Sequence, residues 1–212
     1  MSSEEKNGGK KQGFMGDAMK LFLITLIAGV CLGAAYEVTK APIALAQVAN
    51  EQKQYKGVFE EAASFEENTA ENDKIESSAA EISKTYSNAK IEKVMEAKDS
   101  SGQVIGHVVN AAGKGFGGDV EITIGIRNDG TVNGIGFLSI SESAGLGMNA
   151  EKKDFYGQYA GKKVKQFTVV KKGTGTGADG EINAISGATI TSRAVTNAVN
   201  AAVYFTENCI EK

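Results

Sequence analysis

The sequence predicts an α+β protein with a single N-terminal transmembrane helix, a helical segment, and an antiparallel-sheet domain that ends in a C-terminal helix. Three observations support this prediction. Residues 21–36 are uncharged and approach the roughly 20 apolar residues that span a bilayer. Residues 120–127 alternate between branched apolar and polar or small side chains, as a strand does. Residues 191–208 repeat small apolar side chains at helical spacing.

Composition restricts the chemistry that the chain can perform alone. The formal net charge is -3 and the lysines are dispersed, so we expect no nucleic-acid partner. The chain has one histidine, His107, and two cysteines, Cys31 and Cys209, which lie far apart in the sequence. These residues cannot build a zinc site, an iron–sulfur site or a serine–histidine–acid triad from neighbours. We therefore predict no metal site and no catalytic residues, and redox chemistry would require an organic cofactor.

The N-terminal residues predict a membrane anchor. Residues 1–20 form a polar tail with four lysines, and residues 21–36 form the transmembrane helix. A cleaved signal peptide and a core helix of a soluble protein are the alternatives. The long tail argues against the first, and the lack of a polar stripe argues against the second. The positive-inside rule places the tail in the cytoplasm and everything after Tyr36 outside a single-pass plasma-membrane anchor.

Residues 37–87 are expected to form an extracytoplasmic helical segment. Within it, residues 43–86 are rich in Ala, Glu, Lys and Gln, which favour helix. One apolar face of this helix would comprise Tyr55, Val58, Phe59, Ala62 and Phe65. The sequence leaves open whether the helix is a stalk or part of the following domain, which is assigned to residues 88–212.

The domain of residues 88–212 is predicted to be built on hairpins. Asn128-Asp129-Gly130 is a turn signal between two strands, because Asp-Gly tolerates the positive φ of tight turns. The expected strands are residues 91–97, 103–110, 120–126, 131–140 and 166–170. A short helix is expected at residues 151–159, and the final helix at residues 191–208.

Residues 186–192, Ser-Gly-Ala-Thr-Ile-Thr-Ser, lie where a strand-like segment gives way to the final helix. A helix N-terminus favours anions such as phosphate. Gly187 and Ala188 keep side chains away from such a ligand, and the hydroxyls of Ser186, Thr189 and Thr191 can donate to it. On the residues alone, an ordinary helix cap is the simpler interpretation, because Ser and Thr are preferred there.

Residues 183–192 resemble the flavinylation motif of the FMN-binding domain shared by two membrane subunits. These are the G subunit of Rnf ferredoxin:NAD oxidoreductases and the C subunit of sodium-pumping NADH:quinone reductases. The resemblance extends to a Thr-x-x-Pro-Ile pattern at residues 39–43, a glycine-rich loop at residues 113–118 and Gly-Leu-Gly at residues 145–147. It implies an FMN joined to Thr189 as a phosphoester, and a flavin transferase that attaches it.

The resemblance also implies which residues surround the FMN. The segment that carries the phosphate contains Ser186, Gly187, Ala188, Thr189, Ile190 and Thr191. The loop expected near the isoalloxazine contains Glu142, Ser143, Gly145, Leu146 and Gly147. Residues 113–118 are expected to have a structural role only. The glycines of residues 173–177 do not have the spacing of a dinucleotide-binding loop, so no NAD site is predicted there.

Two positions depart from the family pattern. The family usually has aspartate where this chain has Asn183, and that carboxylate is expected to help the flavin transferase recognise the motif. The family commonly has Glu-Thr-Pro-Gly-Leu-Gly where residues 142–147 read Glu-Ser-Ala-Gly-Leu-Gly. The acid and both glycines are present, so the loop can keep its role.

The resemblance predicts an electron-relay subunit of a membrane complex that couples electron transfer from ferredoxin to NAD with translocation of sodium ions or protons. Its partners would be the other membrane subunits of an Rnf-type complex, and it would not be a complete enzyme alone. The short chain favours the G subunit over the quinone-reductase C subunit. Two further hypotheses are a stand-alone extracytoplasmic flavoprotein and a membrane-tethered interaction module without cofactor, in which Thr189 only caps the helix.

Overall fold

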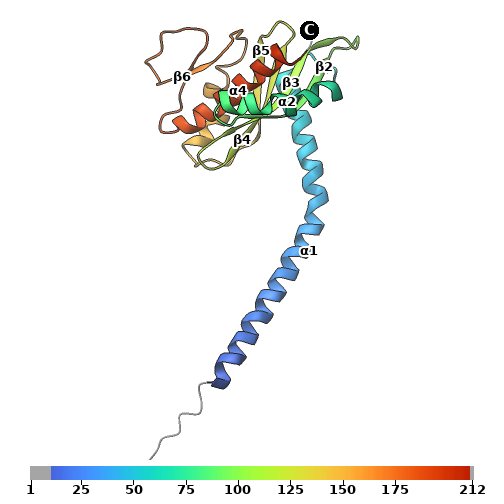
Figure 1. Cartoon of the computed structure of the whole chain (residues 1–212), viewed down its shortest axis with the longest axis vertical. Helices are drawn as coiled ribbons and strands as arrows, with labels where there is room; N and C mark the ends of the chain where they lie inside the picture. The colour runs from blue at the N-terminus through green and yellow to red at the C-terminus, as the bar shows by residue number, and fades with distance from the viewer. Residues whose placement is uncertain (1–10, 211–212) are drawn as a thin grey trace, which may run out of the picture. The chain divides into compact units, whose positions relative to one another are not determined.

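The computed structural model describes residues 11–210, with side chains from residue 15, and it divides into two compact units (Figure 1). The first unit extends to Ala49 and the second begins at Asn50. The expected tail falls partly outside the described residues, and residues 11–20 form the first turns of helix α1 (Lys11–Val58). The predicted transmembrane residues 21–36 lie within this helix.

The first unit is the apolar part of α1. Its large side chains are exposed, for example Phe22 at 62% and Leu32 at 72%. In a protein surrounded by water such exposure would be unfavourable, whereas lipid tails accommodate it. Among the described residues, α1 is the one helix that is long and apolar enough to cross a membrane.

The second unit is built on a five-stranded antiparallel sheet whose strands follow one another in chain order. Its strands are β1 (Ser64–Glu67), β2 (Lys90–Lys98), β3 (Val104–Lys114), β4 (Asp119–Arg127) and β5 (Val132–Ser139). Gly102 and Gly130 adopt φ of 81° and 88° in the turns after β2 and β4. The hairpin predicted at Asn128-Asp129-Gly130 and the antiparallel α+β fold are confirmed.

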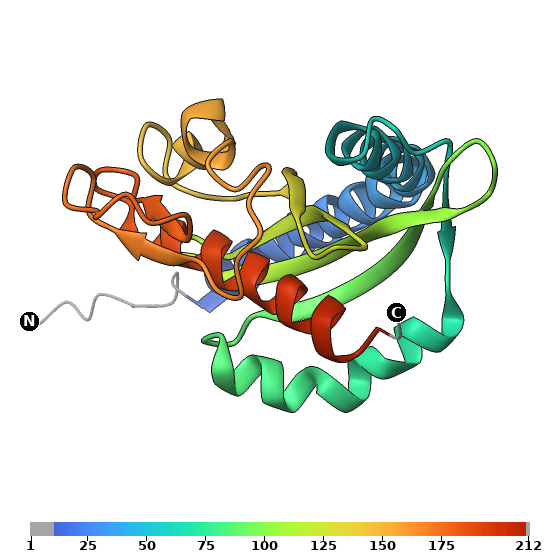
Figure 2. The same ribbon diagram turned by 90° about the horizontal axis from the view of Figure 1, so that it is seen from above.

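Helices α4 (Thr189–Asn208) and α2 (Thr69–Thr85) cover one face of the sheet (Figure 2). The branched side chains of β4 are buried in this layer, as the alternation predicted. Small residues of α4 let its backbone approach β3, so that a Cβ on Gly113 would collide with the carbonyl of Ala194. The largest fully buried side chains of this core include Ile82, Ile122, Ile124, Ile126, Phe167, Ile182 and Phe205.

The last turns of α1 cover the opposite face of the sheet. Tyr55, Val58 and Phe59 are buried there together with side chains of β2 and β3. Glycines make room for this contact: a Cβ on Gly125 would lie 2.7 Å from the carbonyl oxygen of Val58. Residues from Asn50 onward are therefore part of the folded unit rather than a stalk.

The predicted continuous helix over residues 43–86 is wrong. α1 ends at Val58, residues 64–67 form β1, and α2 begins after Asn68. One tertiary contact and one local contact compete with continued helix here. β1 pairs with β2 along its whole length, and the Asn68 side chain accepts a hydrogen bond from the N–H of Ala70 at 3.1 Å. The predicted apolar side chains are nevertheless buried or partly buried in one cluster.

Short elements connect the sheet to α4. The helix expected over residues 151–159 is only partly confirmed. α3 (Lys153–Tyr156) covers four of these residues, and a 3-10 helix (Gly147–Glu151) ends where the expected helix would begin. β6 (Thr168–Val170) and β7 (Glu181–Asn183) then pair in parallel. Residues 184–188 follow β7 directly and form the turn that precedes α4.

Candidate functional site

Within the described part of the chain, no side chain caps the start of α4. The N-cap position is Ala188, whose side chain cannot accept a hydrogen bond, and Thr189 is the first helical residue. In the part of the chain that the structure describes, no group accepts from the N–H of Thr189, Ile190 or Thr191. The interpretation of Thr189 as a helix cap is therefore wrong. Its exposed hydroxyl stands beside backbone donors that remain available to an anion.

The turn before α4 is held by Ser192. Its hydroxyl accepts from the N–H of Ile185 and donates to the carbonyl of Ala188, both at 2.9 Å, and the side chain is fully buried. Gly187 adopts φ of 78°, a left-handed conformation that glycine enters without steric penalty. The Thr189 hydroxyl is therefore presented by a rigid turn.

Glu142 joins three segments at this helix start. Its Oε1 accepts from the backbone N–H groups of Phe116 and Gly117 at 2.7 and 3.1 Å, and its Oε2 accepts from the Thr191 hydroxyl at 3.1 Å. Gly147 is required at its position, because a Cβ there would lie 2.6 Å from Glu142 Oε2 and 2.8 Å from Thr191 Oγ1. The carboxylate thus fixes the loop of residues 113–118, its own loop and α4 relative to one another.

These three segments enclose a cavity of about 380 Å³. Its rim is apolar and exposed: Phe116 at 73%, Leu146 at 46% and Ile190 at 52%. The cavity is lined by Phe116, Glu142, Ser143, Leu146, Gly147, Gly187, Ala188, Thr189, Ile190 and Thr191. The structure therefore brings together every predicted site residue except two: Ser186 lines a neighbouring cavity, and Gly145 lies outside, its carbonyl accepting from Asn149.

Phe116 was not predicted as a site residue. The interpretation of residues 113–118 as a purely structural loop is incomplete, because Phe116 lines the cavity and its N–H binds Glu142. A signal was present in the sequence. Phe116 is a large aromatic residue with a glycine on each side, in a turn rather than in a strand or helix of the core. An aromatic side chain at such a position is exposed, and this indicates contact with a ligand or a partner.

Comparison with known proteins identifies the family of the chain. The family model of the FMN-binding domain matches residues 115–204. The G subunit of a Na⁺-translocating ferredoxin:NAD⁺ oxidoreductase complex from Acetobacterium woodii is 34% identical over 191 residues, 89% of each chain. The chain belongs to the family of G subunits of ion-translocating oxidoreductase complexes.

Two further members of this family are similar to the chain. The G subunit of an ion-translocating oxidoreductase complex from Methanosarcina acetivorans is 30% identical over 184 residues, 86% of this chain and 89% of that one. The G subunit of a proton-translocating ferredoxin:NAD⁺ oxidoreductase complex from Clostridium ljungdahlii is 42% identical over 107 residues, 50% of this chain and 56% of that one. The predicted family is confirmed, and with it an electron-transfer flavoprotein subunit that binds FMN and is anchored in a membrane.

The residues of the cavity fit FMN. A phosphate group needs donors. The N–H groups of Thr189, Ile190 and Thr191 provide them, because they have no acceptor among the described residues. A flat, mostly apolar ring needs apolar walls, which Phe116 and Leu146 provide. The cavity is thus apolar on one side and rich in donors on the other, as a phosphorylated ring compound requires.

Replacing Glu142 by alanine is expected to lower the free energy of unfolding by about 1–3 kcal/mol, because three donors lose their acceptor. Urea denaturation of the purified chain would measure the change. Ser143→Ala is the matched control, since this exposed neighbour makes no side-chain hydrogen bond among the described residues. Equal stability of the two variants would contradict the assigned role of Glu142.

Proposed function

We propose that the chain is an electron-relay subunit that carries FMN covalently, as a phosphoester on Thr189. The complex it serves would couple electron transfer from ferredoxin to NAD with translocation of sodium ions or protons. The observation that supports this proposal best is the start of α4. There an exposed threonine hydroxyl lies beside N–H donors that have no acceptor among the described residues.

Each part of the site has a distinct task in this proposal. The N–H groups of Ile190 and Thr191 bind phosphate oxygens, and the turn at Gly187 keeps side chains away from them. Phe116 and Leu146 shield one side of the ring from water. FMN, when bound, supplies a ring that accepts and donates electrons. Glu142 holds the surrounding loops in place, and we propose that its negative charge lowers the reduction potential of the flavin.

The covalent link has a physical rationale in the proposed topology. The lysines before the apolar run place the N-terminus in the cytoplasm and the FMN domain outside the cytoplasm. A cofactor lost there could not readily be replaced, so a phosphoester retains it while the ring remains free for electron transfer. A flavin transferase would form the link, and the other membrane subunits would be the electron partners.

The test is the mass of the full-length chain. Coexpression with an active flavin transferase is expected to add one FMN to the intact mass and to give a fluorescent band in a denaturing gel. Without the transferase, neither signal is expected. Absence of the added mass from wild-type protein made with active transferase would overturn the covalent proposal.

The similarity over nearly the whole chain favours the G-subunit role over the quinone-reductase C subunit. Relatives with either coupling ion are known, because one is described as Na⁺-translocating and another as proton-translocating. Ion uptake by vesicles containing the whole complex, driven by reduced ferredoxin and NAD, would distinguish the two ions. A flavoprotein that purifies without other subunits would instead support the stand-alone hypothesis.

Replacing Asn183 by aspartate is expected to raise the fraction of flavinylated chain when the transferase is limiting. Asn183 ends β7, and its backbone is held by Gln158 through two hydrogen bonds of 2.8 and 3.2 Å. The backbone bonds survive the substitution. The change adds a negative charge and removes the hydrogen bond of 3.4 Å that the Asn183 amide donates to Gln158 Oε1. Asn208→Asp, an exposed position at the end of α4, is the control. An unchanged or lower fraction in Asn183→Asp would contradict a recognition role for the carboxylate.

A further inference from the structure

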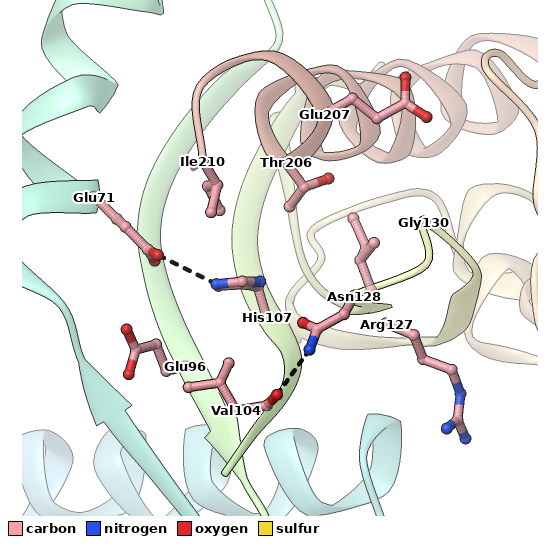
Figure 3. A pocket seen from close by; sticks show the side chains of 11 residues that line it. Glu71, Glu96, Val104, His107, Arg127, Asn128, Gly130, Thr206, Glu207 and Ile210 are labelled. Carbon is pink, nitrogen blue, oxygen red and sulfur yellow. Dashed lines mark hydrogen bonds and ion pairs between the residues drawn. The ribbon is translucent and has the colours of Figure 1, made fainter. Parts of the chain in front are cut away.

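A second cavity, of about 290 Å³, lies between α2, the sheet and the C-terminal end of α4 (Figure 3). It shares no lining residue with the cavity beside Thr189. No role was predicted for it from the sequence, and His107, which lines it, was interpreted as a residue of the sheet. That interpretation is correct, because His107 belongs to β3.

Glu71 of α2 is the unusual residue of this cavity. Its side chain is only 10% exposed, and its Oε1 lies 3.2 Å from Nε2 of His107 (Figure 3). Its other oxygen, Oε2, is buried and has no hydrogen-bond partner in the described part of the chain. A carboxylate oxygen withdrawn from water without a donor is unfavourable. Glu71 therefore has acceptor capacity that the protein does not use.

The charged side chains that line the cavity near Glu71 provide no donor for its unpartnered Oε2 among the described residues. Burial raises the pKa of Glu96, but the hydrogen bond from Asn68 and the adjacent Lys98 outweigh it and hold that pKa below its usual value. Glu96 is thus a second carboxylate at the cavity. Arg127, which also lines it, is bound to Glu61 through contacts of 2.8 and 2.9 Å and points away from His107 (Figure 3).

The remaining walls are largely apolar. Val104, Ile126 and Ile210 contribute apolar surface, beside the polar side chains of Asn128, Thr206 and Glu207. A ligand that combines a positive charge with a hydrocarbon body suits this lining. A bare metal ion is a poor candidate, because no group of three or more His, Cys, Asp or Glu residues suited to a metal occurs among the described residues. An ionised carboxylate can only accept hydrogen bonds, so a ligand group with N–H donors is suited to Glu71 and Glu96.

We propose that this cavity binds the ammonium group of a small alkylamine. The ammonium donates hydrogen bonds to Glu71 and Glu96, and the alkyl chain packs on Ile126 and Ile210. Oε2 of Glu71 has no hydrogen-bond partner among the described residues, so the carboxylate has acceptor sites left for the ammonium. The proposal is independent of FMN attachment, which takes place at the other cavity.

The chain itself provides the probe. His107 is its single histidine, so NMR of one isotope-labelled imidazole reports on this cavity alone. The full-length chain in detergent micelles is titrated with n-butylammonium chloride, with n-butanol as the uncharged analogue and sodium chloride at equal ionic strength. We expect a saturable shift of the His107 signals with the amine only. A shift of equal size with n-butanol or with sodium chloride would overturn the proposal, as would the lack of any shift.

Glu71→Gln keeps the size of the side chain and removes its charge, and it is expected to weaken amine binding about tenfold or more. Glu76→Gln is the matched control, because Glu76 lies on the same helix, is exposed and does not line the cavity. If the two variants bind the amine with equal affinity, the amine is attracted by the overall negative charge of the chain, and the proposed site is contradicted. If Glu71→Gln does not fold, judged by circular dichroism, Glu96→Gln provides the same comparison. FMN attachment should be unchanged in all variants, so failure here is distinct from failure of the proposed function.

Discussion

Thr189→Ala is expected to abolish covalent FMN attachment completely, while the chain remains folded. The substitution removes the hydroxyl that would form the phosphoester. It removes no structural hydrogen bond, because the exposed Thr189 side chain neither caps α4 nor contacts another described side chain through a hydrogen bond. Stability should therefore change by no more than about 0.5 kcal/mol. Intact mass and in-gel flavin fluorescence after coexpression with the transferase measure the attachment, and urea denaturation measures the stability.

Thr189→Ser separates the hydroxyl from the rest of the side chain. It keeps the oxygen that would carry the phosphate, so attached FMN should still be detected. Ser186→Ala tests the neighbouring hydroxyl, which lines the adjacent cavity and should be dispensable for the link itself. If Thr189→Ala still carries the mass of FMN, the flavin is attached to another residue. If Ser186→Ala loses that mass at the same time, the other residue is Ser186.

Gly125→Ala is expected to lower the free energy of unfolding by about 2 kcal/mol, through collision of the new methyl group with α1. A Cβ at this position would lie 2.7 Å from the carbonyl oxygen of Val58 and 3.0 Å from Cδ2 of Phe59. The backbone of Val58 cannot move away without displacing the buried Tyr55 and Phe59. Urea denaturation of the full-length chain would measure the effect.

Gly134→Ala is the matched control for this prediction. Gly134 on β5 also faces Val58, but its Cβ would lie 3.9 Å from the Val58 Cα, an ordinary van der Waals distance. The substitution should change stability by about 0.5 kcal/mol or less. If both variants lose the same stability, the close approach of α1 to β4 is not what requires glycine at position 125.

Local patterns in the sequence predicted most of the fold correctly. The alternation of β4, the Asp-Gly turn before β5 and the small-residue face of α4 each reflect a preference that acts within a few residues. The same is true of the apolar run in α1, because membrane insertion depends on composition and length. Resemblance then identified the motif around Thr189, which chemical preference alone would have assigned to a cap.

Long-range contacts account for the errors. The helix expected over residues 43–86 is broken at β1, because pairing with β2 satisfies the backbone of residues 64–67 better than continued helix does. Glu142 and Thr191 are 49 positions apart, and their hydrogen bond of 3.1 Å, like the contribution of Phe116, follows only from the arrangement of the sheet and α4.

The amino-acid sequence alone was thus sufficient for the membrane helix, the hairpins, the final helix and the family motif, because these depend on neighbouring residues. Three features emerged only from the folded chain: the shape of the cavity, the N–H donors beside Thr189 and the buried Oε2 of Glu71. Neither the donors nor this oxygen has a partner among residues 11–210. A hydrogen bond that is missing can be recognised only when every possible partner has been placed in space.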